Sequence, residues 1–165
     1  MNKEDIKKTR ELIKQGDIES VMILVENDND LLFTETPFGT WLEVASALNR
    51  IELVKYFIGC GIDINKCCGI SNGGPIESAA FKGNLDIVKI LYENGAVLDV
   101  STAEKNPLFS AIYNNHVEVA KFLVENGIDI SASYAIGDIE SCDVYEYARQ
   151  YGRTEIAAYL KEKLE

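Results

Sequence analysis

Residues 40–65 read TWLEVASALNRIELVKYFIGCGIDIN, and this stretch decides the fold. A short apolar segment rich in alanine is followed by a polar break and then by a longer apolar stripe that contains Leu53, Val54 and Phe57. Apolar residues at this spacing indicate an amphipathic helix. Gly61 then suits the left-handed position that ends many helices. The stretch therefore predicts a helix, a tight turn and a second helix.

The same pattern returns along the chain with a period close to 33 residues. Clear copies begin near residues 40, 74 and 106 and a degenerate one near residue 143, so successive steps are 34, 32 and 37 residues long. A weaker copy fits upstream, around residues 12–24. A unit of this length cannot bury both helices alone, so neighbouring units must stack. The period therefore predicts a solenoid.

The repeated unit resembles the ankyrin repeat, whose consensus runs T-P-L-H-x-A-A-x-x-G-H-x-E-I-V-K-L-L-L-x-x-G-A-D-V-N. The resemblance is carried by segments such as GPIESAA (74–80), GNLDIVKIL (83–91) and NHVEVAKFL (115–123), and it covers nearly the whole chain. It implies an all-α ankyrin-repeat solenoid of about five helix-turn-helix repeats with short β-turn fingers. We expect a single domain over residues 1–165, whose first and last repeats are degenerate caps. The expected repeats are about 3–33, 34–68, 69–100, 101–136 and 137–165.

The composition excludes several classes of partner. The chain has 165 residues and carries 27 acidic residues against 16 Lys and Arg, a net charge of −11. This acidity argues against nucleic acid and against an anionic membrane surface as partners. No signal-peptide pattern opens the chain, and the longest aliphatic run, Val21–Val25, is too short for a membrane span. We therefore expect a cytoplasmic protein that is monomeric when free.

Catalytic and metal-binding motifs are not recognisable, so we expect no enzyme activity, no metal and no cofactor. The single histidine, His116, lies where ankyrin repeats commonly carry a turn residue, and we interpret it as structural. The cysteines include the adjacent pair Cys67 and Cys68, and none forms a C-x-x-C motif. We interpret the cysteines as reduced thiols that fill apolar space. The sequence leaves a redox role for the adjacent pair open.

The consensus His after T-P-L is replaced by Glu43, Glu77, Phe109 and Glu146. One hypothesis is a functional row of acidic groups. The alternative, which we favour, is helix capping: Thr40-x-x-Glu43 has the spacing of a capping box, in which the Glu reaches back to the helix start. Glu146 follows Asp143 at the same spacing.

The resemblance implies a concave binding face made of the finger tips and the exposed end of each first helix. In register, these positions place Leu48, Phe81, Tyr113 and Tyr151 in successive repeats. At roughly 10 Å per repeat they would form an apolar and aromatic ladder about 30 Å long. The alternative is that each side chain packs against a neighbouring finger and is partly buried. The predicted partner-binding residues are Leu48, Phe81, Lys82, Tyr113, Asn114, Tyr151, Glu104, Asp138 and Glu140.

A protein-binding module is therefore the expected function. An insertion of about four residues falls between Ser131 and Cys142, and insertions in repeat proteins often lie on the binding face. The leading hypothesis is an immunity or inhibitor protein that neutralises a basic toxin or effector, because we expect the acidity of the chain to surround the groove and attract a basic protein. The alternative is a scaffold or regulatory adaptor that recruits a cellular protein without inhibiting it.

Overall fold

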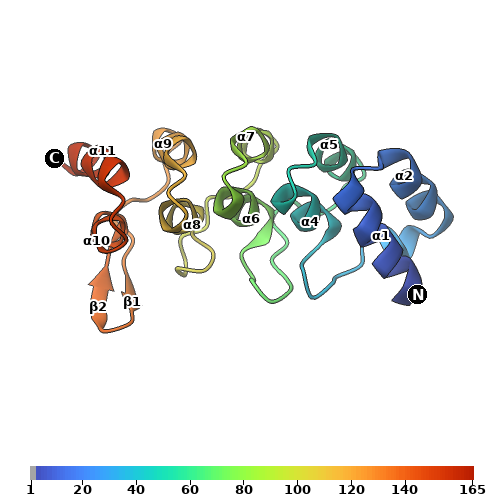
Figure 1. The fold of residues 1–165 in the computed structure, drawn as a ribbon, viewed down its shortest axis with the longest axis horizontal. Helices are drawn as coiled ribbons and strands as arrows, with labels where there is room; N and C mark the ends of the chain where they lie inside the picture. The colour runs from blue at the N-terminus through green and yellow to red at the C-terminus, as the bar shows by residue number, and fades with distance from the viewer. Residues whose placement is uncertain (1–2) are drawn as a thin grey trace.

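A computed structural model describes residues 3–165 as a row of antiparallel helix pairs (Figure 1). The first helices of the pairs form one layer and the second helices form another. The loops that join one pair to the next project from the first layer, and we call them the fingers. The helices α1 and α11 lie at opposite ends of the molecule. The first helices are α1 (Lys3–Gln15), α4 (Trp41–Ala47), α6 (Gly74–Lys82), α8 (Pro107–Tyr113) and α10 (Val144–Gln150). The second helices are α2 (Ile18–Asn27), α5 (Ile51–Gly59), α7 (Leu85–Glu93), α9 (Val117–Glu125) and α11 (Thr154–Leu164).

This arrangement confirms the expected all-α solenoid of helix-turn-helix units. Two smaller elements add to it. The short helix α3 (Asn29–Leu32) follows α2, and the buried indole of Trp41 donates a hydrogen bond of 2.7 Å from Nε1 to the carbonyl oxygen of Leu31. The insertion expected before α10 forms an antiparallel hairpin of β1 (Tyr134–Ile136) and β2 (Ile139–Cys142). None of the helices over residues 3–165 is both long and apolar enough to cross a membrane.

The core lies between the two helix layers and continues from repeat to repeat. Alanines such as Ala45, Ala79 and Ala111 are fully buried in the first helices, where their small side chains let neighbouring helices approach closely. The second helices contribute larger buried side chains, among them Phe57 and Leu91. Full burial of such a side chain stabilises a fold by about 1.5–3 kcal/mol. Stacking therefore supplies the stability that one repeat lacks.

The turns follow the sequence prediction closely. Gly61, Gly95 and Gly127 end the second helices with φ of 80°, 94° and 84°, the left-handed conformation that favours glycine. Between the two helices of a repeat, Asn49 and Asn115 take the same conformation. Asparagine tolerates this region better than most other residues, so the turn does not require a glycine there.

Side chains at the start of each second helix from α5 onward connect neighbouring repeats. Each lies against carbonyl groups at the end of the first helix of the preceding repeat. Asn84, for example, donates from Nδ2 to the carbonyl oxygens of Ser46 (2.7 Å) and Ala47 (3.3 Å). Nε2 of His116 lies 3.1 Å from the carbonyl oxygen of Phe81, so His116 is a structural turn residue that also bridges two repeats. The equivalent residues in the row are Arg50, Asn84, His116 and Arg153.

The capping-box prediction is only half right. The hydroxyl of Thr40 accepts the backbone N–H of Glu43 at 3.2 Å, as a cap should. The carboxylate of Glu43 does not complete the box, because its Oε1 accepts hydrogen bonds from the hydroxyls of Ser71 (2.9 Å) and Ser78 (3.2 Å) in the next repeat. Glu43 is only 2% exposed, and burial raises the pKa of its carboxyl.

Glu77 repeats this arrangement one unit later. Its Oε1 accepts a hydrogen bond of 2.5 Å from the hydroxyl of Ser110, and burial raises the pKa of its carboxyl too. At the C-terminal cap, Asp143 accepts the backbone N–H of Glu146, but the Glu146 side chain pairs with Arg149 at 3.0 Å instead of reaching back. Glu43 and Glu77 are therefore links between repeats, and neither hypothesis drawn from the sequence described them.

Candidate functional site

The predicted ladder residues lie at the ends of the first helices and are partly exposed. Leu48, Phe81, Tyr113 and Tyr151 are 36–43% exposed, so each is partly buried and none is buried completely. The rings of Phe81 and Tyr113 stack with centroids 6.2 Å apart and an interplanar angle of 17°. Tyr151 meets Tyr113 edge-on at 5.1 Å. Phe81, Tyr113 and Tyr151 thus form a continuous surface across three repeats, which we call the aromatic row.

More deeply placed rings support the aromatic row from below. Phe109 is buried and packs against Tyr147, with ring centroids 4.5 Å apart, and Tyr147 in turn packs against Tyr151 at 4.7 Å. The ring of Phe109 also meets Tyr134 of the hairpin edge-on at 5.0 Å. Phe109 and Tyr147 are not among the predicted site residues, although the replacement of the consensus His by Phe109 was the available signal.

The hairpin is anchored to the preceding finger by its tyrosine. The hydroxyl of Tyr134 donates a hydrogen bond of 2.6 Å to the carbonyl oxygen of Val100 and accepts one of 3.1 Å from Nδ2 of Asn106. Asn106 also caps α8, since its Oδ1 accepts the backbone N–H of Leu108 at 2.9 Å. The position of the hairpin beside the aromatic row is therefore coupled to the start of α8.

A hollow of about 430 Å³ lies beside the aromatic row, and we call it the C-terminal groove. Of the predicted acidic residues only Glu104 lines it. Asp138 and Glu140 are exposed on the hairpin but do not line the groove, because the hairpin presents other residues to it. The lining includes Phe81, Glu104, Phe109, Tyr113, Ala135, Ile136 and Tyr147.

Asn114 does not line the C-terminal groove and has a local structural role instead. Its backbone ends α8, and its Nδ2 donates a hydrogen bond of 3.4 Å to the carbonyl oxygen of Ser110 in the same helix. Lys82 remains exposed, with its ammonium group 5.3 Å from the ring centroid of Phe81. The structure therefore brings most of the predicted apolar residues together but separates them from three of the five predicted polar ones.

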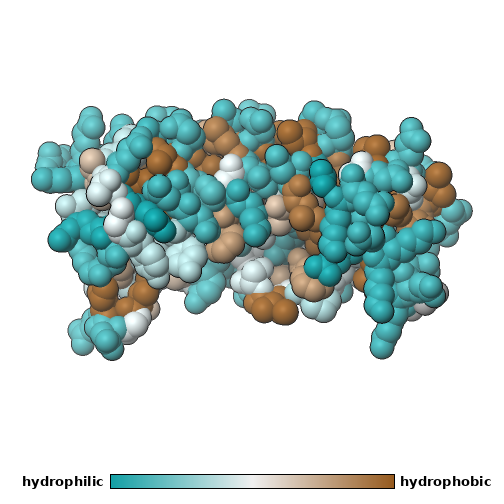
Figure 2. All heavy atoms as spheres, in the orientation of Figure 1, coloured by the Kyte–Doolittle hydropathy of each residue, from teal (hydrophilic) through white to brown (hydrophobic). Residues whose placement is uncertain are grey.

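A second hollow, of about 460 Å³, lies at the other end of the concave face, and we call it the N-terminal groove. Its apolar wall includes Phe38 (50% exposed) and Ile70 (85% exposed), both from fingers. Figure 2 shows hydrophobic atoms at the lower edge of the molecule, over the finger that precedes α6. The exposed apolar residues that line this groove are Phe38, Leu48 and Ile70. The cations that line it are Arg10, Lys14 and Lys82, and Glu43 lies buried in its wall.

Two fingers are tied together beneath this groove. The backbone N–H of Ile70 donates a hydrogen bond of 3.0 Å to the carbonyl oxygen of Pro37. Gly69 lies so close to Gly39 that an added Cβ would stand 2.5 Å from the Gly39 nitrogen. The loop around Ile70 therefore packs against the neighbouring finger. Of the groove residues, sequence reasoning found Leu48 and Lys82 but missed Phe38 and Ile70.

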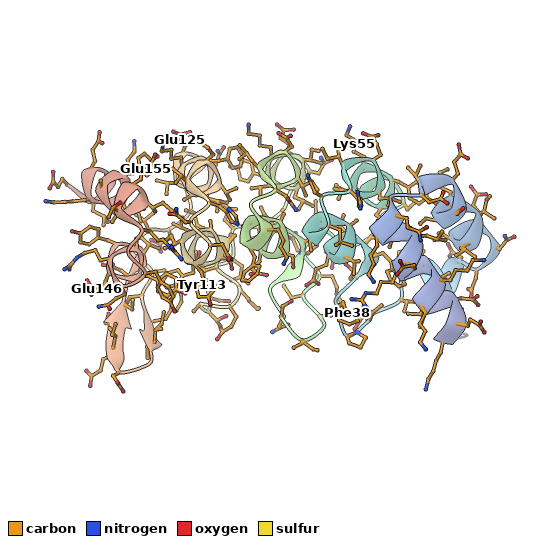
Figure 3. The ribbon with its side chains drawn as sticks, viewed as in Figure 1. Phe38, Lys55, Tyr113, Glu125, Glu146 and Glu155 are labelled. Atoms are coloured by element: carbon orange, nitrogen blue, oxygen red, sulfur yellow. The ribbon has the colours of Figure 1, made fainter. Side chains whose placement is uncertain are left out.

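Part of the acidic charge lies on the second-helix layer, away from both grooves. The second helices α2, α5, α7, α9 and α11 together carry nine Asp and Glu against five Lys. Figure 3 shows Glu125 and Glu155 in that layer. Phe38 lies on the opposite side of the molecule, in a finger. The expectation that acidic residues surround the binding surface is wrong for the N-terminal groove. The reason is that second-helix positions face solvent and accept charge without regard to the groove.

The adjacent cysteines show no sign of activation. Burial raises the pKa of both the Cys67 and the Cys68 thiol, which favours the unreactive protonated form. Among residues 3–165 no cluster of His, Cys, Asp and Glu side chains is arranged to hold a metal ion. The chemistry that the concave face offers is therefore that of a recognition surface: exposed rings, apolar side chains and a few charges.

Comparison with known proteins places the repeats in a family. A family model for ankyrin repeats in three copies matches residues 42–134, which is more than half of the chain. The ankyrin repeat protein R96 of Acanthamoeba polyphaga mimivirus is 33% identical over 95 residues, which are 57% of this chain and 9% of that protein. The palmitoyltransferase AKR1 of Lachancea kluyveri is 33% identical over 94 residues, which are 55% of this chain and 13% of that protein. The match thus spans only a small part of either relative.

Proposed function

Because the chain belongs to the ankyrin-repeat family, whose repeats form protein-interaction modules, we propose that it is an inhibitor of the immunity type. In this proposal it binds a basic cognate toxin or effector through the concave face and blocks the active or docking site of that protein. The chain acts as a single domain over residues 1–165 with the repeat boundaries given above. It is monomeric when free and works in the cytoplasm without a cofactor.

The aromatic row is the observation that carries the proposal. Three large rings from three successive repeats are held in contact with one another, and each keeps about two fifths of its surface exposed. Aromatic side chains of this kind supply most of the binding energy in protein interfaces, because they bury a large area at little cost in conformational entropy. A row fixed by its neighbours is also preorganised, which lowers the entropic cost of binding.

Charge supports the choice of a basic partner at the C-terminal end. Glu104 lines the C-terminal groove, and the hairpin beside it exposes Asp138 and Glu140. With a net charge of −11, the whole chain also attracts a basic protein over distances of the order of a Debye length, about 8–10 Å at physiological salt. Association should therefore slow as salt is raised.

A rescue assay tests the proposal. The partner is captured from the host with the wild-type chain, and the captured protein is then expressed together with each variant. We expect wild type to protect cells, and the triple substitution Phe81→Ala, Tyr113→Ala and Tyr151→Ala to lose protection, because each anchor contributes about 1 kcal/mol or more. Ile23→Ala, on the exposed side of α2, is the matched control and should still protect.

The outcomes separate the two functional hypotheses. A captured protein that is not toxic, and whose activity is unchanged in the complex, would favour a scaffold or adaptor that recruits without inhibiting. Binding that survives the triple substitution would overturn the assignment of the aromatic row as the binding surface.

A further inference from the structure

The concave face is divided into two halves of opposite charge, and its N-terminal half is basic. We propose that the N-terminal groove binds an acidic apolar segment of the partner, in which a bulky apolar side chain is flanked by Asp or Glu. This inference rests on the proposed function only in treating the concave face as a protein-binding surface. It adds the chemistry of one contact and the direction in which the partner lies.

The apolar side chains of this groove come from two successive repeats and are left uncovered. Phe38 and Ile70 stand on neighbouring fingers, and Leu48 ends α4 between them and the helix layer. All three keep between 36% and 85% of their surface exposed. A partner side chain that fills the hollow removes apolar surface from water on several sides at once, which is the arrangement of an anchor pocket.

The cations around this hollow are available to a ligand. Neither Arg10 nor Lys82 forms an ion pair with any residue in the described part of the chain, and Lys14 pairs only with the exposed Glu11 at 3.1 Å. The guanidinium carbon of Arg10 lies 3.5 Å from the ring centroid of Phe38. A guanidinium stacked on a ring keeps its N–H edge free, and that edge matches a carboxylate in a two-bond arrangement.

The acidic group in the wall does not cancel these cations. Glu43 is buried, and its Oε1 is occupied by the hydroxyls of Ser71 and Ser78. Its Oε2 has no hydrogen-bond partner and is covered by Gly39, since an added Cβ there would stand 1.8 Å from that oxygen. Burial raises the pKa of this carboxyl, which favours its neutral form. The exposed charge that lines the N-terminal groove is therefore positive.

The other end of the concave face carries the opposite sign. Glu104 lines the C-terminal groove, and the hairpin beside it exposes Asp138 and Glu140. A basic partner that contacts this end and offers an acidic apolar segment to the N-terminal groove would fit in one direction only, because the reversed complex would place like charges together. The groove thus selects orientation as well as partner.

Panning a displayed library of random peptides against the wild-type chain tests this inference without a known partner. We expect enriched peptides to combine Leu, Phe or Trp with neighbouring Asp or Glu. Fluorescence anisotropy of the labelled peptides then measures their affinity for Arg10→Glu/Lys82→Glu, which should be weakened roughly tenfold or more, because two attractions become repulsions. Phe38→Ala should weaken the same peptides.

The control is Lys55→Glu/Lys89→Glu, which changes the net charge by the same amount on the second-helix layer, where Figure 3 places Lys55. We expect this control to change affinity less than twofold. Enrichment of basic peptides, or failure to obtain any peptide that responds to Arg10→Glu/Lys82→Glu, overturns the inference. Peptides that lose affinity with Tyr113→Ala alone would overturn the inference while leaving the proposed function standing.

Discussion

Replacing Asn84 with alanine tests whether the bridges between repeats stabilise the solenoid. The side chain donates two hydrogen bonds across the boundary between α6–α7 and α4, to the carbonyl oxygens of Ser46 and Ala47. It makes no capping hydrogen bond to its own helix, so the substitution removes the bridge without removing a cap. Alanine also leaves the backbone free to keep its conformation, since Asn84 has φ of −80°.

The expected loss follows from what each carbonyl retains. The oxygen of Ser46 still accepts the backbone N–H of Asn49 at 3.4 Å, so its loss is partial. The oxygen of Ala47 loses its bond to the side chain, and water at this half-buried site can replace only part of it. A typical hydrogen bond contributes about 1 kcal/mol, so we expect Asn84→Ala to lower the free energy of unfolding by about 1–2 kcal/mol.

Equilibrium unfolding in urea, followed by circular dichroism, measures this change. The matched control is Asn94→Ala, because Nδ2 of Asn94 donates a similar bond of 2.8 Å to Ile90, but within its own helix end and on the surface. We expect the control to lose less than about 0.5 kcal/mol. Equal losses in the two variants would refute the reasoning that the bridge across the boundary matters. A lower m-value in Asn84→Ala alone would show that the repeats on either side had begun to unfold separately.

Further predictions concern the hairpin, the buried carboxylates and the core. Tyr134→Phe should lower stability by about 1–2 kcal/mol and increase amide hydrogen exchange in the hairpin, because the carbonyl of Val100 loses its donor; unchanged exchange would contradict this anchoring role. For Glu43 and Glu77, raised pKa values mean that the native state binds more protons than the unfolded chain, so their contribution to stability falls as pH rises from about 4.5, the ordinary value, through the raised native pKa values. Urea unfolding across this range should show a smaller decline in the Glu43→Gln/Glu77→Gln double variant, and parallel profiles would refute the assignment. Leu91→Ala, which empties a fully buried site, should cost about 2–5 kcal/mol in the same assay, and a loss below 1 kcal/mol would show that the core is not packed there as described.

The sequence alone determined the architecture, because the same helix-turn-helix pattern recurs in every repeat. The alternation of a short alanine-rich helix with a longer apolar one predicted the helix pairs, and Gly61 with its equivalents predicted where the second helices end. The register of the repeats also predicted which side chains end the first helices. That is why Phe81 and Tyr113 could be placed beside one another before their rings were seen to stack.

Contacts between repeats could not be predicted in the same way, since they depend on how neighbouring units pack in space. The spacing of Thr40 and Glu43 suggested a local capping box, but the carboxylate found two hydroxyls in the next repeat, where burial made such partners necessary. Local spacing describes one helix, whereas a buried polar group is satisfied by whichever partner the tertiary structure brings within reach.

The charge of the concave face was also decided only in three dimensions. A net charge of −11 says nothing about where the charge lies, and the sequence gives no sign that Arg10, Phe38 and Lys82 line one hollow. They come from three different repeats, and only the stacking of those repeats brings them together. Periodicity therefore determined the fold, whereas the tertiary structure decided the binding surface, because a groove between repeats is made of residues that are distant in the chain.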